Sequence, residues 1–186
     1  MRIFSYMNRF IVSFSFIFIS FSLIAEPTLE EVVVSARKVD ESVQDVPIAM
    51  SVFTASDIND AGIERPEDFI ALTPNVVMAN TVNVGDTLVT IRGLTSTRDA
   101  ESNFAFVVDG VLQTNPNAFN RELLDIAQIE VLKGPQGALY GRNATSGAIL
   151  ITTKAPSDEP ESSAVVGMGI NNSSKLQYVN SSKMGD

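Results

Sequence analysis

The sequence predicts an α+β fold in which a small mixed β-sheet packs against short helices. Three patterns indicate it. Residues 46–54 alternate between apolar and small or polar side chains, which is typical of a half-buried strand. Two short helical segments with terminal signals follow. Further short strands, bounded by glycine, proline or polar residues, occur between residues 88 and 153. This succession of short elements favours the α+β class over an all-helical or all-β domain.

Both helices are predicted from their first residues. Thr54 and Asp57 have the spacing of a capping box, so the first helix should begin directly after Thr54. Pro66 suits the first turn of the second helix, where a missing N–H leaves no helical hydrogen bond unmade. We expect Phe69 and Leu72 to be the inward-facing residues of this second helix.

A tight hairpin is predicted at Asp109-Gly110, between the apolar runs Phe104–Val108 and Val111–Gln113. Asp-Gly between apolar strands is a strong hairpin signal because both residues tolerate a positive φ. A further strand, Leu88–Gly93, ends in Ile-Arg-Gly. The sequence around these strands predicts three polar loops, at residues 80–86, 95–103 and 115–120.

The stretch 129–154 contains two more strands joined by a glycine-rich connection. Polar and apolar side chains alternate over residues 128–131, which predicts a half-buried strand. Gly134-Pro135 should end that strand, because proline has no N–H for a ladder. Residues 148–153 are apolar and β-branched and predict the second strand.

The composition excludes several classes of function. The chain has 13 basic and 22 acidic residues and a formal charge of −9, which argues against a nucleic-acid partner. It contains no cysteine and no histidine, so disulfides, thiolate or imidazole metal sites and Ser-His-Asp or Cys-His catalysis are excluded. We therefore expect a protein that is not an enzyme, with no catalytic residues, no metal site and no cofactor.

Residues 1–25 have the features of a cleaved signal peptide. Arg2 and Arg9 give a positive start, and the uncharged run 10–25 follows and ends in alanine. At ~1.5 Å per residue this run is shorter than the ~30 Å hydrocarbon core of a membrane. Export is therefore favoured over the alternative of a membrane anchor.

Residues 26–45 are predicted to form a mobile arm, because they are polar apart from the apolar island Val32–Val34. Three consecutive valines favour an extended backbone, which can add as a strand to the sheet edge of a partner. A disordered tail with a chance valine run, or a first strand of the domain, remain as alternatives.

The stretch 129–154 resembles the end of the plug domain of TonB-dependent outer-membrane receptors. In that family a strand, a Gly-Pro break, Leu-Tyr-Gly and a strand after a glycine-rich loop occur in this order, as they do in IEVLKGPQGALYGRNATSGAILITTK. The segments IRGL and FVVDGVLQ and the Leu-Thr-Pro that ends the second helix are similar to earlier parts of the plug. The resemblance covers roughly residues 30–154 and implies a plug domain over residues 46–155.

The same resemblance implies a TonB box in the arm. This is the segment by which the family's receptors are gripped by TonB, the periplasmic partner that works with an inner-membrane energising complex. The residues that correspond to it are Glu30, Glu31, Val32, Val33, Val34, Ser35 and Ala36.

The resemblance also implies a latch between plug and barrel. In the family an arginine in Ile-Arg-Gly and an arginine before Gly-Pro pair with glutamates of the barrel wall. Arg92 matches the first position, whereas Lys133 departs from the second. Lysine keeps the charge but lacks the bidentate fork, so a latch here would be looser or differently built. Two solvated strand-end cations are the alternative.

The three polar loops would lie at the outward apex of a plug, where they would touch an arriving ligand. Amides, hydroxyls and an arginine can hydrogen-bond oxygen-rich ligands such as ferric chelates. The candidate contact residues are Asn80, Asn83, Thr97, Arg98, Asp99, Asn115 and Asn117.

Residues 156–162 are predicted to be a linker, and residues 163–186 an incomplete first hairpin of a transmembrane β-barrel. Barrels that hold plugs have about 22 strands, and two strands cannot close. The sequence is therefore interpreted as an excerpt, a truncated reading frame or a plug-only product.

The function implied is the plug and TonB-coupling portion of an outer-membrane active transporter for ferric siderophores or similar scarce nutrients. The protein would lie in the cell outer membrane, or in the periplasm if the chain ends at Asp186. The alternatives are a barrel-less periplasmic module that binds TonB or ligand, and a non-functional truncated remnant.

Overall fold

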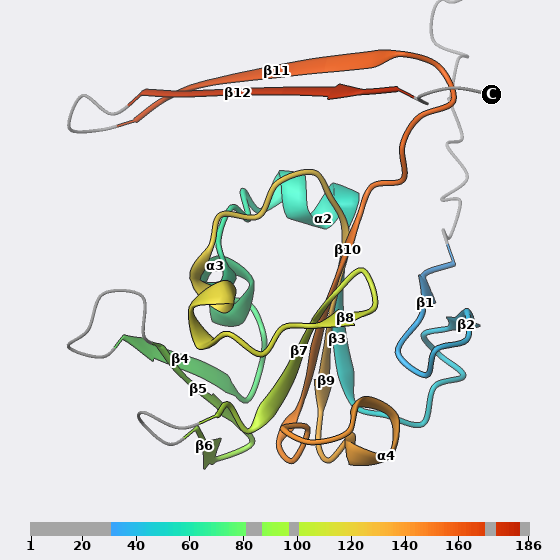
Figure 1. The fold of residues 1–186 in the computed structure, drawn as a ribbon, viewed down its shortest axis with the longest axis vertical. Helices are drawn as coiled ribbons and strands as arrows, with labels where there is room; N and C mark the ends of the chain where they lie inside the picture. The colour runs from blue at the N-terminus through green and yellow to red at the C-terminus, as the bar shows by residue number, and fades with distance from the viewer. Residues whose placement is uncertain (1–30, 81–86, 97–100, 170–173, 183–186) are drawn as a thin grey trace, which may run out of the picture. The chain divides into compact units, whose positions relative to one another are not determined.

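The fold is built around a mixed sheet of five strands in the order β3-β9-β10-β7-β8. The computed structural model describes residues 31–80, 87–96, 101–169 and 174–182, so the predicted signal peptide and Glu30 lie outside the described residues. Strand β10 is parallel to β7 and antiparallel to β9, and the three strands lie at the centre of the view in Figure 1. The strands are β3 (Met50–Thr54), β7 (Phe104–Val108), β8 (Val111–Leu112), β9 (Ile126–Lys133) and β10 (Gly147–Thr153). The predicted mixed sheet is confirmed.

The hairpin between β7 and β8 has the predicted turn. Asp109 and Gly110 both have positive φ, 48° and 78°. Val108 pairs with Val111 across this two-residue turn, and Val107 pairs with Leu112. Asp109 also closes the far end of β10, because its carboxylate accepts hydrogen bonds from the N–H and the hydroxyl of Thr153 at 2.8 and 3.0 Å.

A second sheet of three antiparallel strands contains two strands that the sequence did not predict. Its members are β4 (Val76–Asn80), β5 (Thr87–Ile91) and β6 (Leu94–Thr95), in that order. Only the strand at residues 88–93 was expected, and β4 and β6 were not. β4 follows directly from the second helix through Asn75, whose φ of 63° turns the chain.

The two helices begin at the predicted residues. Helix α2 (Ala55–Asp60) has the complete capping box between Thr54 and Asp57, and α3 (Pro66–Ala71) has proline in its first turn. Phe69 is fully buried, as expected. The prediction for Leu72 is wrong, because the helix ends before it and its side chain is 54% exposed. Ile70 fills the inward position instead.

Four phenylalanines form the centre of the first core, on one face of the five-stranded sheet. The ring of Phe119 lies edge-on to those of Phe104 and Phe106, with centroids 5.2 and 5.0 Å apart, and Phe69 lies 6.4 Å away. Such edge-to-face pairs are typical of aromatic cores. Residues 115–120 were expected to be a polar loop. They instead contain a 3₁₀ helix, η2 (Pro116–Asn120), which buries Phe119.

The opposite face of the sheet carries a second core. It contains Ala36, Ala105, Val107, Leu132, Ala144, Ala148 and Leu150. The prediction that the strand at residues 128–131 is half-buried is therefore wrong, because β9 is buried on both faces. Its second face is covered by helix α4 (Gly137–Tyr140) and by the segment that contains β1 (Val33–Val34) and β2 (Glu41–Ser42).

The last two strands form a separate antiparallel hairpin, β11 (Glu161–Met168) with β12 (Ser174–Ser181). It begins two residues before the predicted position. Val166 pairs with Leu176 and Ala164 with Tyr178, so these four side chains share one face. Among the described residues, no helix is long and apolar enough to cross a bilayer.

Substitution of Gly147 tests how closely strands β9 and β10 approach each other. A Cβ added there would overlap the Leu132 carbonyl oxygen and lie 3.2 Å from Ile91 Cδ1. We expect Gly147→Ala to destabilise the chain by about 1–3 kcal/mol or more, because backbone must move to admit a methyl group. The measurement is the midpoint of urea unfolding.

Gly137 provides the matched control, since a Cβ added there meets nothing within 4 Å. Because Gly137 lies in helix α4, we expect Gly137→Ala to be neutral or to stabilise by about 0.4–1 kcal/mol. Equal midpoints for the two alanine variants would contradict the close approach.

Candidate functional site

Residues 32–36 of the predicted TonB box lie in a short folded segment of the chain. Val33 and Val34 pair with Ser42 and Glu41 in an antiparallel ladder, and the Val43 N–H donates to the Val32 carbonyl at 3.0 Å. The side chains alternate in exposure, because Val33 is 49% exposed and Val34 is 1% exposed. Residues 32–45 of the predicted arm thus carry buried side chains, Val34 and Ala36, which agrees with the alternative of a first strand of the domain. We call residues 32–45 the N-terminal segment.

Three side chains from the rest of the fold hold this segment. The Ser35 N–H and hydroxyl both donate to Glu130 Oε1, at 3.0 and 3.2 Å. Gln128 Nε2 donates to the Val33 carbonyl at 3.0 Å. The Tyr140 hydroxyl donates to the Ala36 carbonyl at 2.8 Å. The segment is thus fixed at three nearly consecutive residues of its backbone.

Glu130 is the most unusual of these residues. Its side chain is 2% exposed, and its Oε2 is a buried oxygen with no hydrogen-bond partner among the described residues. Burial raises the pKa of this carboxyl, the donors of Ser35 and Ala36 act in the opposite direction, and the negative charge of Asp40 raises the pKa further. Burial, with a contribution from the Glu130 charge, raises the pKa of Tyr140 to about 12.

Beside this segment the second face of the sheet is partly open. A groove of about 680 Å³ is lined by Ser35 and Lys38 of the segment and by sheet residues that include Val107 and Leu150. The N-terminal segment therefore covers only part of an apolar surface that continues past it.

The structure brings the two candidate latch residues together. Arg92 has a φ of 51° and is exposed, and the position of a Cβ on Gly134 would lie 3.0 Å from its Nη1. Lys133 Nζ donates to Ser51 Oγ at 3.0 Å. Burial lowers the pKa of Lys133, and the positive charge of Arg92 lowers it further. Neither cation forms an ion pair with a described carboxylate.

Most of the candidate ligand contacts are not brought together by the described structure. Asn80 ends β4, Asn115 is exposed, and Asn117 lies in η2 rather than in an open loop. The remaining four lie outside the described residues: Asn83, Thr97, Arg98 and Asp99.

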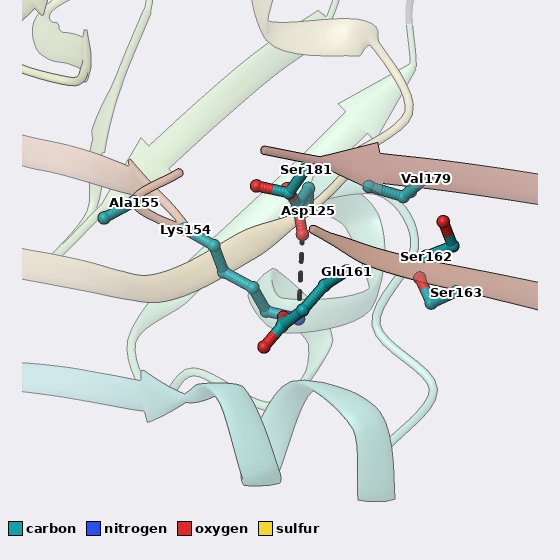
Figure 2. A pocket seen from close by; sticks show the side chains of 8 residues that line it. All are labelled: Asp125, Lys154, Ala155, Glu161, Ser162, Ser163, Val179 and Ser181. Carbon is teal, nitrogen blue, oxygen red and sulfur yellow. Dashed lines mark ion pairs between the residues drawn. The ribbon is translucent and has the colours of Figure 1, made fainter. Parts of the chain in front are cut away.

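A second hollow, of about 300 Å³, lies where strand β10 leads into the hairpin of β11 and β12. Lys154 and Asp125 form an ion pair beside it, 3.7 Å apart, and serines of β11 and β12 complete its lining (Figure 2). In the part of the chain that the structure describes, no group of three or more acidic side chains converges as metal ligands would. We assign no function to this hollow.

Sequence reasoning missed Glu130, Gln128 and Tyr140 as partners of the N-terminal segment. One signal was present. Glu130 shares its face of β9 with Leu132, and its neighbour across the ladder is Leu150. A carboxylate between apolar side chains on one face indicates a covered face, on which the charge needs donors.

Comparisons with known proteins agree with this fold. The family model described as TonB-dependent Receptor Plug Domain matches residues 42–148. The pesticin receptor of Yersinia enterocolitica is 31% identical over 136 residues, which are 73% of this chain and 20% of the receptor. The vitamin B12 transporter BtuB of Vibrio vulnificus is 27% identical over 165 residues, which are 86% of this chain and 26% of that protein. The chain thus spans about a fifth to a quarter of the length of these relatives.

Solved structures give the same result. The ferric yersiniabactin uptake receptor FyuA from Yersinia pestis superposes with a TM-score of 0.68 and 28% identity, covering 75% of this chain and 22% of that one. The ferripyoverdine receptor of Pseudomonas aeruginosa has the same fold, with a TM-score of 0.70 at 19% identity and coverage of 83% and 20%. The resemblance found in the sequence is confirmed, and the chain belongs to the family of TonB-dependent receptor plug domains.

Proposed function

We propose that this chain is the plug and TonB-coupling portion of an outer-membrane active transporter for ferric siderophores or similar scarce nutrients. The observation that carries the proposal is the plug-domain match over residues 42–148. The names of the relatives favour this class of substrate, since they include a ferric yersiniabactin uptake receptor and a ferrichrome outer membrane transporter of Escherichia coli. Export through the signal peptide at residues 1–25 would bring the chain to the outer membrane.

In this proposal TonB binds the segment Glu30–Ala36 by adding a strand to it. The extended backbone and the exposed side chain of Val33 suit such an addition. However, Val33 and Val34 already pair with β2. Addition of TonB along that edge would require the segment to leave the ladder first. The ladder is only two residues long, and each hydrogen bond contributes a net ~1 kcal/mol, so breaking the ladder requires little free energy.

Arg92 and Lys133 would latch the plug to the barrel wall. Two neighbouring cations without a described carboxylate partner repel each other, and acidic side chains of a surrounding wall would relieve that repulsion. Lys133 would serve as a point charge and Arg92 as the bidentate donor.

Ligand would bind at the apex loops, through residues such as Asn83, Arg98 and Asp99. Amide groups and a guanidinium are donors that suit the oxygen-rich surface of a ferric chelate. Binding there and force on the N-terminal segment would together rearrange the plug and open a path.

Strand addition predicts a sharp effect of proline at residue 33. We expect Val33→Pro to weaken binding of the secreted chain to the C-terminal domain of TonB by about tenfold or more, because proline removes a ladder donor. The measurement is isothermal titration calorimetry. Val33→Ala keeps the N–H and should bind within about threefold of the parent, since only side-chain contact is lost. Equal binding by the proline variant and the parent would exclude this mode of coupling.

The proximity of the latch cations predicts a change in the titration of Lys133. We expect Arg92→Asn to raise the pKa of Lys133 toward its ordinary value of 10.5, because a neighbouring positive charge is removed. Recovery should be partial, since burial is the larger cause. Asparagine tolerates the positive φ of this position. The measurement is an NMR titration of the lysine side chain.

Arg65→Asn is the matched control for this titration, because Arg65 pairs with Glu122 and is not among the groups that shift the pKa of Lys133. A Lys133 pKa that does not change in Arg92→Asn would contradict the proximity on which the latch depends.

A further inference from the structure

The N-terminal segment and an incoming TonB strand compete for the same backbone groups. Docking of the segment uses the Val33 carbonyl, the Ser35 N–H and the Ala36 carbonyl, which bond to Gln128, Glu130 and Tyr140 respectively. A strand that adds to residues 30–36 needs backbone donors and acceptors from this same short run. The docked segment is therefore closed to strand addition along these groups.

We infer that Glu130 is a positioning residue that holds the N-terminal segment on the sheet and sets how readily the segment is released. The inference about docking stands on the contacts of Glu130. Its consequence for TonB rests on the function proposed above.

Glu130 is central because its Oε1 accepts three hydrogen bonds from residues that hold or belong to the segment. Oε1 accepts from the N–H and hydroxyl of Ser35 and from Gln128 Nε2, the last at 3.2 Å. Gln128 in turn holds the Val33 carbonyl, so one carboxylate oxygen connects two of the three anchor points. Without that acceptor the docked segment would bury the N–H of Ser35 unpaired, which proteins avoid.

The same residue keeps docking weak. Its second oxygen is buried and has no described partner, so docking the segment removes a carboxylate from water with only half of its acceptors used. In return the segment buries the side chains of Val34 and Ala36 and few others. A gain this small against a buried charge is suited to a reversible contact rather than a permanent one.

Protonation of Glu130 should strengthen docking. A proton can occupy Oε2 while Oε1 goes on accepting from Ser35. The docked carboxyl has a raised pKa, so docking is strongest below the ordinary value of 4.5 and weakens as the pH rises through the docked value. The ionisable groups that face Glu130 are Asp40 on the segment and Tyr140 on α4, with Lys38 Nζ located 5.7 Å from the Tyr140 ring.

Hydrogen exchange of the full secreted chain tests the inference. Glu130→Met removes the acceptor but keeps the length of the side chain. We expect amides of residues 33–36 to exchange at least tenfold faster in this variant, while amides of Val131 and Ile149 keep their protection. Glu130→Gln retains an acceptor and should stay within threefold of the parent. Glu122→Gln, at an exposed carboxylate, is the matched control and should change nothing.

The pH dependence of hydrogen exchange distinguishes the proposed role of Glu130 from a merely structural one. Between pH 7.5 and 4.5, protection of residues 33–36, corrected for intrinsic rates, should rise in the parent and in Asp40→Asn. It should stay constant in Glu130→Gln. A rise that persists in Glu130→Gln, or protection of residues 33–36 that is unchanged in Glu130→Met, would overturn the inference.

If Glu130→Met loses protection at Val131 and Ile149 as well, Ser35→Pro provides the second variant. It removes the donor from the segment side and leaves β9 intact, so it must release residues 32–36 for the inference to hold. Affinity for the TonB C-terminal domain separates the two hypotheses. Faster exchange in Glu130→Met with tighter TonB binding supports both. Faster exchange with no TonB binding by any variant supports the positioning role of Glu130 and contradicts the proposed coupling.

Discussion

Strands β9 and β10 have apolar side chains on both faces, and the other elements of the fold are arranged to cover them. Ile129 and Val131 are buried on one face, and Leu132 and Leu150 on the other. Burial of apolar surface stabilises a fold by roughly 25 cal/mol per Å², so both faces need to be covered. The helices, η2 and the second sheet cover the first face. The second is covered in part by α4 and in part by a segment from the other end of the chain.

The separation in sequence between interacting residues explains most of what the sequence could and could not predict. The capping box at Thr54, the Asp109-Gly110 turn and the strands flanking it depend on residues close in sequence, and all were predicted. Strand β4 was missed although it pairs with the adjacent strand β5. The burial of Phe119 was also missed, and it depends in part on the distant Phe69. The partners of the N-terminal segment were missed for the same reason, since Ser35 and Glu130 lie 95 residues apart in sequence. Alternation over residues 128–131 indicated a half-buried strand, because the segment that covers the other face of β9 is distant in sequence and gives no local signal.

The cationic pair at the other end of β9 has a different origin. Gly134, with a φ of 114°, leaves room for the Arg92 guanidinium to cross the chain next to Lys133. A side chain at residue 134 would occupy that space. The glycine of the family-like Gly-Pro break therefore does more than end a strand, because it permits two like charges to approach. Such an arrangement is unfavourable by itself, which is the physical reason to expect an anionic partner for it.

The docked N-terminal segment would link the stability of the plug to the coupling proposed above. A protein whose binding-competent state is only partly populated has its apparent affinity reduced by that fraction. In the coupling proposed here, contacts that hold the segment down would therefore lower the apparent affinity for TonB without touching TonB. We infer that a buried carboxylate with one unpartnered oxygen makes those contacts strong enough to order the segment and weak enough to allow its release. The second face of the sheet thus needs a cover for folding, and the coupling proposed here needs the same cover to leave.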